Sequence, residues 1–198
     1  MTIIGGGVVG TNAAKMAVGL GASVTILDVN AARLEYLDDI FKGRCMTLYS
    51  NAKNIEDSVR ESDLLIGGVL ITGQKAPTLV SKEMVSSMSK GSVVVDVAVD
   101  QGGCIETCRP TSHTHPTYEV DGVIHYCVPN MPGVVPRTST YALTNVTLKY
   151  ASLIAAMGVE DAVARDRNLL KGLNVYGGHV VYEPVARDLG MEYKPYRQ

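Results

Sequence analysis

Short apolar runs alternate with helix-like segments along the first 130 residues. The apolar runs are "TIIG", "SVTILD", "CMTLYS", "LLIGGVL", "SVVVDVAV" and "VIHYCV", and each predicts a strand. Between them the pattern predicts helices over residues 11–20, 31–41, 51–61 and 81–88, the last of which Ser81 can cap. This alternation predicts a Rossmann-type, doubly wound α/β fold, in which helices cover both faces of a parallel sheet. The continuous apolar runs are typical of strands buried on both faces.

The pattern changes after Asn130. "PNMPGVVPRTSTY" combines prolines with a Thr/Ser cluster and predicts a turn followed by a helix start. We expect a long helix from Thr140 to Met157 that stops at Gly158, and a second helix over 159–173. A short extended piece and a last helical turn follow in "HVVYEPVARDLG". We therefore expect an α/β domain over 1–136 and a helical tail over 137–198, which lacks a strand-rich unit of its own and needs a partner to pack against.

A glycine-rich loop follows the first predicted strand and opens the first helix. In "GGGVVG", Gly5 permits a tight turn, Gly7 lets the backbone approach a pyrophosphate, and Gly10 lets the helix pack close to the strand. Free amides at the helix N-terminus then face the phosphates, at the favourable end of the helix dipole. The motif therefore predicts a dinucleotide site.

An acidic residue, Asp28, closes the second predicted strand in "VTILDVN". At this spacing from the glycines, its carboxylate can accept hydrogen bonds from the adenine-ribose hydroxyls. It would repel a 2′-phosphate, so NAD is favoured over NADP, although the nearby Arg33 tempers this preference. The alternative role for Asp28 is to cap the following helix.

A second polar cluster, "DVAVDQGGCIETCRPTSHTHPTY", follows the fifth predicted strand. Asp100 lies at or just beyond the carboxyl end of this strand, where doubly wound sheets bind ligands, whereas Asp96 is expected to make a structural hydrogen bond. His113 and His115 are expected to be solvated, and His125 shows no partner in the sequence.

Composition excludes several classes of function. The formal net charge of −2 gives no reason to expect nucleic acid or an anionic membrane as a partner, and the predicted strands are too short to span a bilayer. No secretion signal begins the chain, so a cytoplasmic location is expected. The four cysteines form no CxxC pair, and no metal site is expected.

The chain resembles the family that alanine dehydrogenases share with the NAD-binding subunit of proton-translocating transhydrogenase. The resemblance covers essentially all 198 residues. It rests on "GGGVVGTNAAK", "TILDVN", "KAPTLVSKEMV", "VDVAVDQGGCIETCRPTSHTHPTY" and "YCVPNMPGVVPRTSTYALTN". "DQGGCIE" and "NMPGVVPRTSTYALTN" point to the alanine dehydrogenase branch, which catalyses reversible, NAD-linked oxidative deamination of L-alanine to pyruvate and ammonium.

This resemblance implies a set of cofactor-binding residues. Asp28 and Arg33 would hold the adenosine ribose, Val8 would offer its backbone to the pyrophosphate, and Ser50 would lie near the adenine. Asp100 matches the family aspartate beside the reacting carbon, which is the implied catalytic residue. The residues implied beneath the cofactor and around the nicotinamide are Val69, Leu70, Val97, Ala98, Val99, Asp100, Arg109, Val128, Pro129, Asn130 and Met131.

The resemblance also implies that this sequence is one part of a larger enzyme. Members of the family begin with a substrate domain, whose lysine binds the substrate carboxylate and whose histidine serves as acid and base. No lysine or histidine in this sequence matches those motifs. We therefore expect the helical tail to belong to an otherwise missing substrate domain, and the chain alone to bind NAD(H) without turnover. Self-association is also expected, since complete members of the family are commonly homohexamers.

Two alternatives remain open from the sequence. The chain could be a non-catalytic NAD-binding module that acts as a sensor or an assembly partner. It could also be a transhydrogenase-type NAD-binding subunit, although "DQGGCIE" argues against this branch.

Overall fold

The computed structural model describes residues 1–71 and 76–196, and the chain forms two units. The first unit is Met1–Pro129 and the second is Asn130–Gln198. Each unit has its own internal packing.

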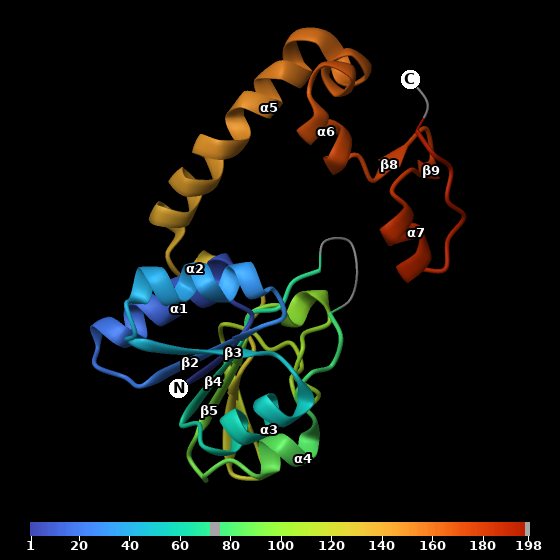
Figure 1. Ribbon diagram of the computed structural model, residues 1–198. Helices are drawn as coiled ribbons and strands as arrows, with labels where there is room; N and C mark the ends of the chain where they lie inside the picture. Colours follow the sequence, from blue (N-terminus) through green and yellow to red (C-terminus); the bar gives the residue numbers. More distant parts are fainter. Residues whose placement is uncertain (72–75, 197–198) are drawn as a thin grey trace. The chain divides into compact units, whose positions relative to one another are not determined.

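A seven-stranded sheet forms the centre of the first unit (Figure 1). Its strands are β1 (Thr2–Ile4), β2 (Val24–Asp28), β3 (Cys45–Tyr49), β4 (Leu64–Gly67), β5 (Val93–Asp96), β6 (Thr117–Val120) and β7 (Val123–Tyr126). The order across the sheet is β3-β2-β1-β4-β5-β7-β6, and every neighbouring pair is parallel except β6 and β7. The strand order reverses between β1 and β4, so the predicted Rossmann-type, doubly wound fold is confirmed.

Two helices cover each face of this sheet. Helices α1 (Val8–Gly19) and α2 (Ala31–Phe41) lie on one face, and α3 (Ala52–Arg60) and α4 (Lys82–Ser86) lie on the other (Figure 1). Successive strand residues point to opposite faces, so Ile3 belongs to the core beneath α1 and α2, while Ile4 belongs to the core beneath α3 and α4. Both side chains are buried, and so is Thr2, whose hydroxyl donates to the Ser58 carbonyl at 3.0 Å, so every position of β1 is covered.

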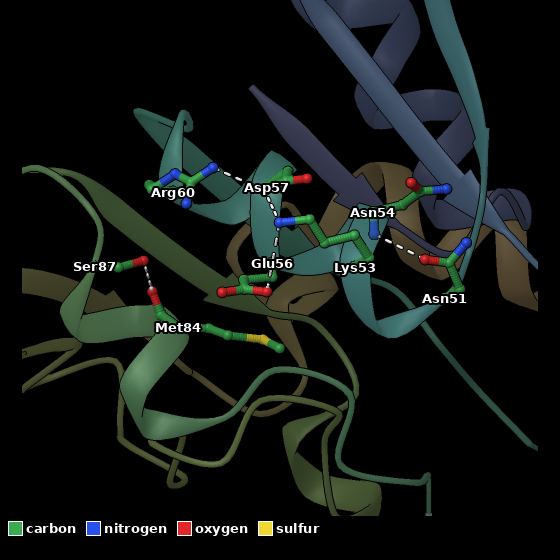
Figure 2. Close-up of polar contacts among 8 residues, drawn as sticks. All are labelled: Asn51, Lys53, Asn54, Glu56, Asp57, Arg60, Met84 and Ser87. Carbon is green, nitrogen blue, oxygen red and sulfur yellow. Dashed lines mark hydrogen bonds and ion pairs between the residues drawn. The ribbon is translucent and has the colours of Figure 1, made fainter.

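Helix α3 shows how a short helix that packs on this sheet is stabilised (Figure 2). The Asn51 side chain caps it by accepting a 2.8 Å hydrogen bond from the amide three residues on. Lys53 and Arg60 both pair with Asp57, at 2.8 and 2.7 Å, on the exposed side of the helix. Because such exposed pairs contribute little, burial of the apolar face of α3 supplies most of its stability.

Strand β6 is the element of the sheet that the apolar pattern missed, whereas β7 matches the strand predicted at "VIHYCV". Strand β6 ("TYEV") is half exposed and lies antiparallel to β7 at the edge of the sheet. Asp121 and Gly122 join the two strands with φ of 53° and 85°. An Asp-Gly pair between two short strands is a known hairpin signal, because both turn positions need positive φ.

The second unit is built around a long helix. Its elements are η2 (Met131–Val134), α5 (Pro136–Arg165), α6 (Arg167–Gly172), β8 (Val175–Tyr176), β9 (His179–Val180) and α7 (Glu183–Asp188). Gly158 has non-helical backbone angles (φ 82°) inside α5, so the predicted stop at this residue is confirmed.

Two predictions for the second unit were wrong in their bounds. The long helix begins at Pro136 and not at Thr140, because proline is favoured at the first position of a helix. The helix predicted over 159–173 is divided at Asp166, whose side chain accepts a hydrogen bond from the Asn168 amide and so starts α6.

Helix α5 leaves many apolar side chains uncovered. Those at least one-third exposed include Tyr141, Leu143, Val146, Leu148 and Ile154. Among the described residues, α5 is also the helix whose length and mean hydropathy (1.2) would allow it to cross a membrane. Length and composition alone do not distinguish such a helix from one that packs against another part of a protein.

Candidate functional site

The glycine-rich loop lies between β1 and α1, at the point where the strand order reverses. Gly5 has φ of 100°, and a Cβ there would lie 2.7 Å from the Gly68 carbonyl oxygen. A Cβ at Gly10 would lie 2.0 Å from the Gly5 carbonyl oxygen and 3.0 Å from a methyl group of Ile3. Gly5 therefore serves the turn, and Gly10 permits the close packing of α1 on β1.

Gly7 differs from these two glycines, because a Cβ there would meet no heavy atom within 4 Å. Gly7 is the N-cap residue of α1 and has no side chain that could bond to the amides of the first turn. Val8 follows it with 79% of its surface exposed. The N-terminus of α1 thus presents free amides beside open space, which is the arrangement that binds phosphate.

Asp28, at the carboxyl end of β2, faces this loop. Its Oδ2 accepts a 2.7 Å hydrogen bond from the Gly6 amide, and its Oδ1 accepts a 2.8 Å hydrogen bond from the Asn30 amide. The cap of α2 is Asn30, whose side chain accepts from the Arg33 amide at 3.1 Å. Asp28 is therefore not the N-cap of α2, and its half-buried carboxylate stays beside the glycine loop.

Arg33 reaches the same loop from α2. Its Nε donates to the Gly6 carbonyl at 2.6 Å, and a terminal nitrogen donates to Thr11 Oγ1 at 2.7 Å. The guanidinium also lies over the ring of Tyr36, 4.8 Å from its centroid. Arg33 does not line the cavity above this loop, and its backbone contacts are with the carbonyl side of the loop.

A cavity of about 520 Å³ opens above the glycine loop, beside the carboxyl ends of β1, β2 and β4. Its volume is in the range of small-molecule sites, and parallel sheets of this kind bind ligands at this edge. The predicted residues that line it are Gly5, Gly7, Val8, Asp28, Ser50, Val69 and Leu70. The other lining residues, which are mostly apolar, are Ile4, Val9, Leu27, Val29, Gly68, Ile71, Pro77 and Leu79.

One aspartate, Asp96, ends β5 and another, Asp100, follows it, and the two have different environments. Asp96 is buried and accepts hydrogen bonds from the amides of Ala98, Cys104 and Ile105 at 3.1, 2.9 and 3.3 Å. Burial raises the pKa of this carboxyl, and the three amides oppose that shift. The structural role expected of Asp96 is thus the one observed.

Asp100 is exposed on the short helix η1 (Val99–Gln101), just beyond the end of β5. Val97 begins this connection, and its amide donates to the Gly67 carbonyl at 2.9 Å. The segment from Val97 to Asp100 therefore leaves the sheet at the same carboxyl edge as the glycine loop.

Arg109 lies apart from the glycine-loop cavity. Its guanidinium lies over the Tyr118 ring, 4.2 Å from the centroid, and its amide donates to the Tyr118 hydroxyl at 2.8 Å. It lines a separate hollow of about 290 Å³ with Thr111, Ser112, His115, Thr117 and Tyr118.

The remaining predicted residues fall on both units. Val128 and Pro129 follow β7 at the end of the first unit, where Val128 is buried. Asn130 and Met131 belong to the second unit, in which Asn130 has φ of 53° and precedes η2. The described residues contain no group of three or more His, Cys, Asp and Glu side chains that could hold a metal ion.

A buried polar cluster behind β7 escaped the sequence analysis. No partner was expected for His125. Its Nε2 lies 2.8 Å from Thr107 Oγ1, and its Nδ1 lies 2.9 Å from the Val123 carbonyl oxygen. The ring also stacks on Tyr118. Burial lowers the pKa of its imidazole. These contacts suit a neutral ring that donates to Val123 and accepts from Thr107.

Two cysteines extend this cluster. The Cys108 thiol donates to Cys127, and this hydrogen bond is the main reason why the pKa of Cys127 falls to about 7 although burial opposes the shift. The same hydrogen bond and burial raise the pKa of Cys108 above its usual range. The Tyr118 hydroxyl also lies 3.8 Å from the Cys127 sulfur.

Thr11 is a polar residue of the glycine-loop region that sequence reasoning missed. It is buried on the first turns of α1, where its hydroxyl lies 2.7 Å from the Gly7 carbonyl oxygen and 3.1 Å from that of Gly6. The available signal was a polar residue four positions after Gly7, on a helix face that is otherwise buried.

Residues 1–183 match the family described as alanine dehydrogenase/PNT, C-terminal domain. The chain is 64% identical over 196 residues to the alanine dehydrogenase of Bacillus subtilis (strain 168), which covers 98% of this chain and 52% of that protein. It is 61% identical to the alanine dehydrogenase of Methanococcus maripaludis, with the same shares of the two chains. The chain thus spans about half the length of these curated relatives.

Solved structures give the same picture. A structure of L-alanine dehydrogenase superposes with a TM-score of 0.85 at 57% identity, over 96% of this chain and 52% of that one. The transhydrogenase of Sinorhizobium meliloti superposes with a TM-score of 0.56 at 35% identity, over 65% of this chain and 35% of that one.

Proposed function

The chain belongs to the alanine dehydrogenase/PNT C-terminal domain family, and on this premise we propose that it is the NAD(H)-binding part of an L-alanine dehydrogenase. The observation that carries the proposal is the cavity above the glycine loop, which joins the free amides of α1 to the carboxylate of Asp28. A phosphate site and a ribose site lie side by side there, as a dinucleotide requires.

Different residues of this cavity would bind different parts of the cofactor. The α1 N-terminus and Gly7 would take the pyrophosphate, since that position is open and its amides are free. Asp28 would accept hydrogen bonds from the adenine-ribose hydroxyls, and Ser50, at the end of β3, would lie near the adenine. Val69 and Leu70 would cover the cofactor from the β4 side.

Asp28 also favours NAD(H) over NADP(H). A 2′-phosphate about 4 Å from its carboxylate would be repelled by about 4 kcal/mol for each unit charge, at an effective dielectric constant of ~20. Arg33 does not line the cavity, and its guanidinium already donates to the Gly6 carbonyl and to Thr11, so these donors are not free to pair with a 2′-phosphate.

The proposed reaction is the reversible oxidative deamination of L-alanine to pyruvate and ammonium. Bound NAD⁺ would supply the hydride acceptor, which the protein binds and orients. Asp100, exposed beyond β5, is the residue that we propose to position the substrate or relay a proton beside it. We also propose that Arg109, Val128 and Pro129, which belong to the first unit, lie around the nicotinamide.

We propose that the 198 residues alone bind NAD(H) without turning over alanine. The family's substrate lysine and acid/base histidine have no counterpart here by motif, and acid/base assistance alone contributes a factor of about 10² to 10⁴ in rate. NADH fluorescence titration of the purified chain should show saturable binding, and alanine with NAD⁺ should produce no NADH above the blank. Alanine-dependent NADH formation would contradict the proposed lack of turnover. A flat titration would contradict the proposed binding of NAD(H).

The non-catalytic alternative predicts the same NAD(H) binding but no need for a substrate domain. A sensor or assembly module would act without a substrate domain, whereas a dehydrogenase needs one for turnover. Mixing the chain with the N-terminal half of a related alanine dehydrogenase tests this difference. Restored alanine oxidation supports the enzymatic function.

The transhydrogenase branch is a weaker candidate. Identity to the transhydrogenase structure is 35%, against 57% for the alanine dehydrogenase structure.

We propose that the protein is located in the cytoplasm, where its free cysteines would stay reduced. We also propose that it forms homo-oligomers, since α5 exposes apolar side chains that favour association.

A further inference from the structure

The carbonyl side of the glycine loop is held by two side chains from different helices. Thr11, on α1, donates from Oγ1 to the Gly7 carbonyl at 2.7 Å, with the Gly6 carbonyl at 3.1 Å. Arg33, on α2, donates from Nε to the Gly6 carbonyl at 2.6 Å and from a terminal nitrogen to Thr11 Oγ1 at 2.7 Å. The two side chains thus form one connected network on the two loop carbonyls.

The opposite side of the Gly6 residue is held as well, since its amide donates to Asp28 Oδ2 at 2.7 Å. Gly6 and Gly7 have no side chains that could fix their backbone angles, and glycine has the largest conformational freedom of any residue. The orientation of these peptide groups therefore depends on contacts from outside the loop.

We propose that Thr11 and Arg33 clamp the Gly6 and Gly7 carbonyls so that the amides at the start of α1 face the cofactor pyrophosphate. This inference rests on the proposed NAD(H) site and assigns to both side chains a positioning role. Neither lines the cavity, and Thr11 is buried, so both act through the loop and not by touching the phosphates. An amide aimed at a phosphate before binding loses less entropy on binding.

The clamp also bears on the choice of cofactor. Arg33 is the cation next to the Asp28 carboxylate in this region, and a free arginine there could bind a 2′-phosphate. Its contacts with Gly6, Gly7 and Thr11 would have to break before it could do so. Arg33 therefore serves the pyrophosphate subsite at the expense of NADP(H) binding.

Thr11→Val tests the clamp, because valine keeps the shape of threonine and removes the hydroxyl. We expect the Kd values of NADH and ADP to rise about fivefold to tenfold, the effect of losing about one hydrogen bond. The Kd of adenosine, which lacks phosphates, should change less than twofold in competition against NADH. Thr11→Ser keeps a hydroxyl and should restore wild-type values for all three ligands.

A matched control is Thr147→Val on α5, where the threonine hydroxyl makes a comparable 2.9 Å bond to the Leu143 carbonyl. It should leave all three Kd values unchanged. Wild-type ADP affinity in Thr11→Val, or an equal loss of ADP and adenosine affinity, would overturn the clamp. A wild-type chain that binds neither NADH nor ADP would instead contradict the proposed function.

Hydrogen–deuterium exchange tests the clamp without any ligand. In Thr11→Val the peptide that contains Gly5–Val9 should exchange faster than in the wild type, while peptides from β4 and β5 stay unchanged. Unchanged exchange in the loop would overturn the clamp whatever the chain binds.

Discussion

Gly7 and its neighbours show how single positions divide between the fold and the ligand. A Cβ at Gly5 or Gly10 would strike the protein backbone, whereas a Cβ at Gly7 would enter open space. The protein's own packing thus explains glycine at the first two positions and not at the third. A pyrophosphate that approaches the backbone supplies the missing reason for Gly7.

Asp28 provides a prediction at this scale. Asp28→Asn keeps an oxygen that can accept from the Gly6 amide and removes the charge. We expect the ratio of Kd for NADPH to Kd for NADH to fall at least about tenfold, because charge repulsion near 4 Å exceeds 1.4 kcal/mol. The control is Asp38→Asn, on the exposed side of α2. An unchanged ratio in Asp28→Asn would contradict the ribose role.

His125 provides a pH prediction. Burial holds its pKa below the value of about 6.5 that it has in the unfolded chain. Between these two pKa values the unfolded state binds more protons, so the free energy of unfolding falls as pH drops from about 6.5 through the folded pKa.

Urea unfolding at pH 7.5 and 5.5 checks this sign. His125→Gln should lose less stability than the wild type over this interval, and His179→Gln, at an exposed position of the second unit, should behave as the wild type. An equal pH loss in wild type and His125→Gln would argue against the buried neutral ring.

At the scale of elements, Gly10 determines how closely α1 packs on β1. Gly10→Ala places a Cβ 2.0 Å from the Gly5 carbonyl oxygen, and overpacking of this kind costs about 1–3 kcal/mol. Gly19→Ala is the matched control on the same helix, because a Cβ there meets nothing within 4 Å and alanine favours helix by about 0.5–1 kcal/mol. Thermal unfolding should show Tm lowered in the first variant and unchanged or raised in the second. Equal Tm values would contradict the packing argument.

The elements that the sequence predicted are those with a buried face. The parallel strands and α1 to α4 follow from runs such as "TIIG" and "SVTILD", since both faces of the sheet are covered. Strand β6 was missed because it lies at the edge of the sheet and is half exposed, so its pattern carries little apolar signal. The break at Asp166 was missed because a local side-chain cap, and not periodicity, ends the helix there.

The site was predictable in part for a similar reason. Gly5 and Asp28 lie at strand ends and Gly10 lies on the first turn of α1, where the motif spacing alone places them. The link between Thr11 and Arg33 joins two helices across 22 positions of sequence, and no local pattern marks such a pair. Partners of buried polar side chains, such as Thr107 for His125, also depend on tertiary packing.

At the scale of the whole molecule, the two units have different degrees of internal support. The first unit encloses two apolar cores, one on each face of its sheet. In the second unit, α5 leaves side chains such as Val146 and Leu148 exposed. The chain spans about half the length of its curated relatives. We propose that α5 packs against a substrate domain in the complete enzyme.

We propose that the first unit binds an adenine dinucleotide across the carboxyl ends of β1 and β2. A crystal structure of the chain grown with NAD⁺ tests it most directly. The predicted result is a pyrophosphate on the amides at the start of α1, with the adenine-ribose hydroxyls on the Asp28 carboxylate. NAD⁺ bound away from the glycine loop, or an Asp28 carboxylate that makes no contact with the ribose, would contradict it.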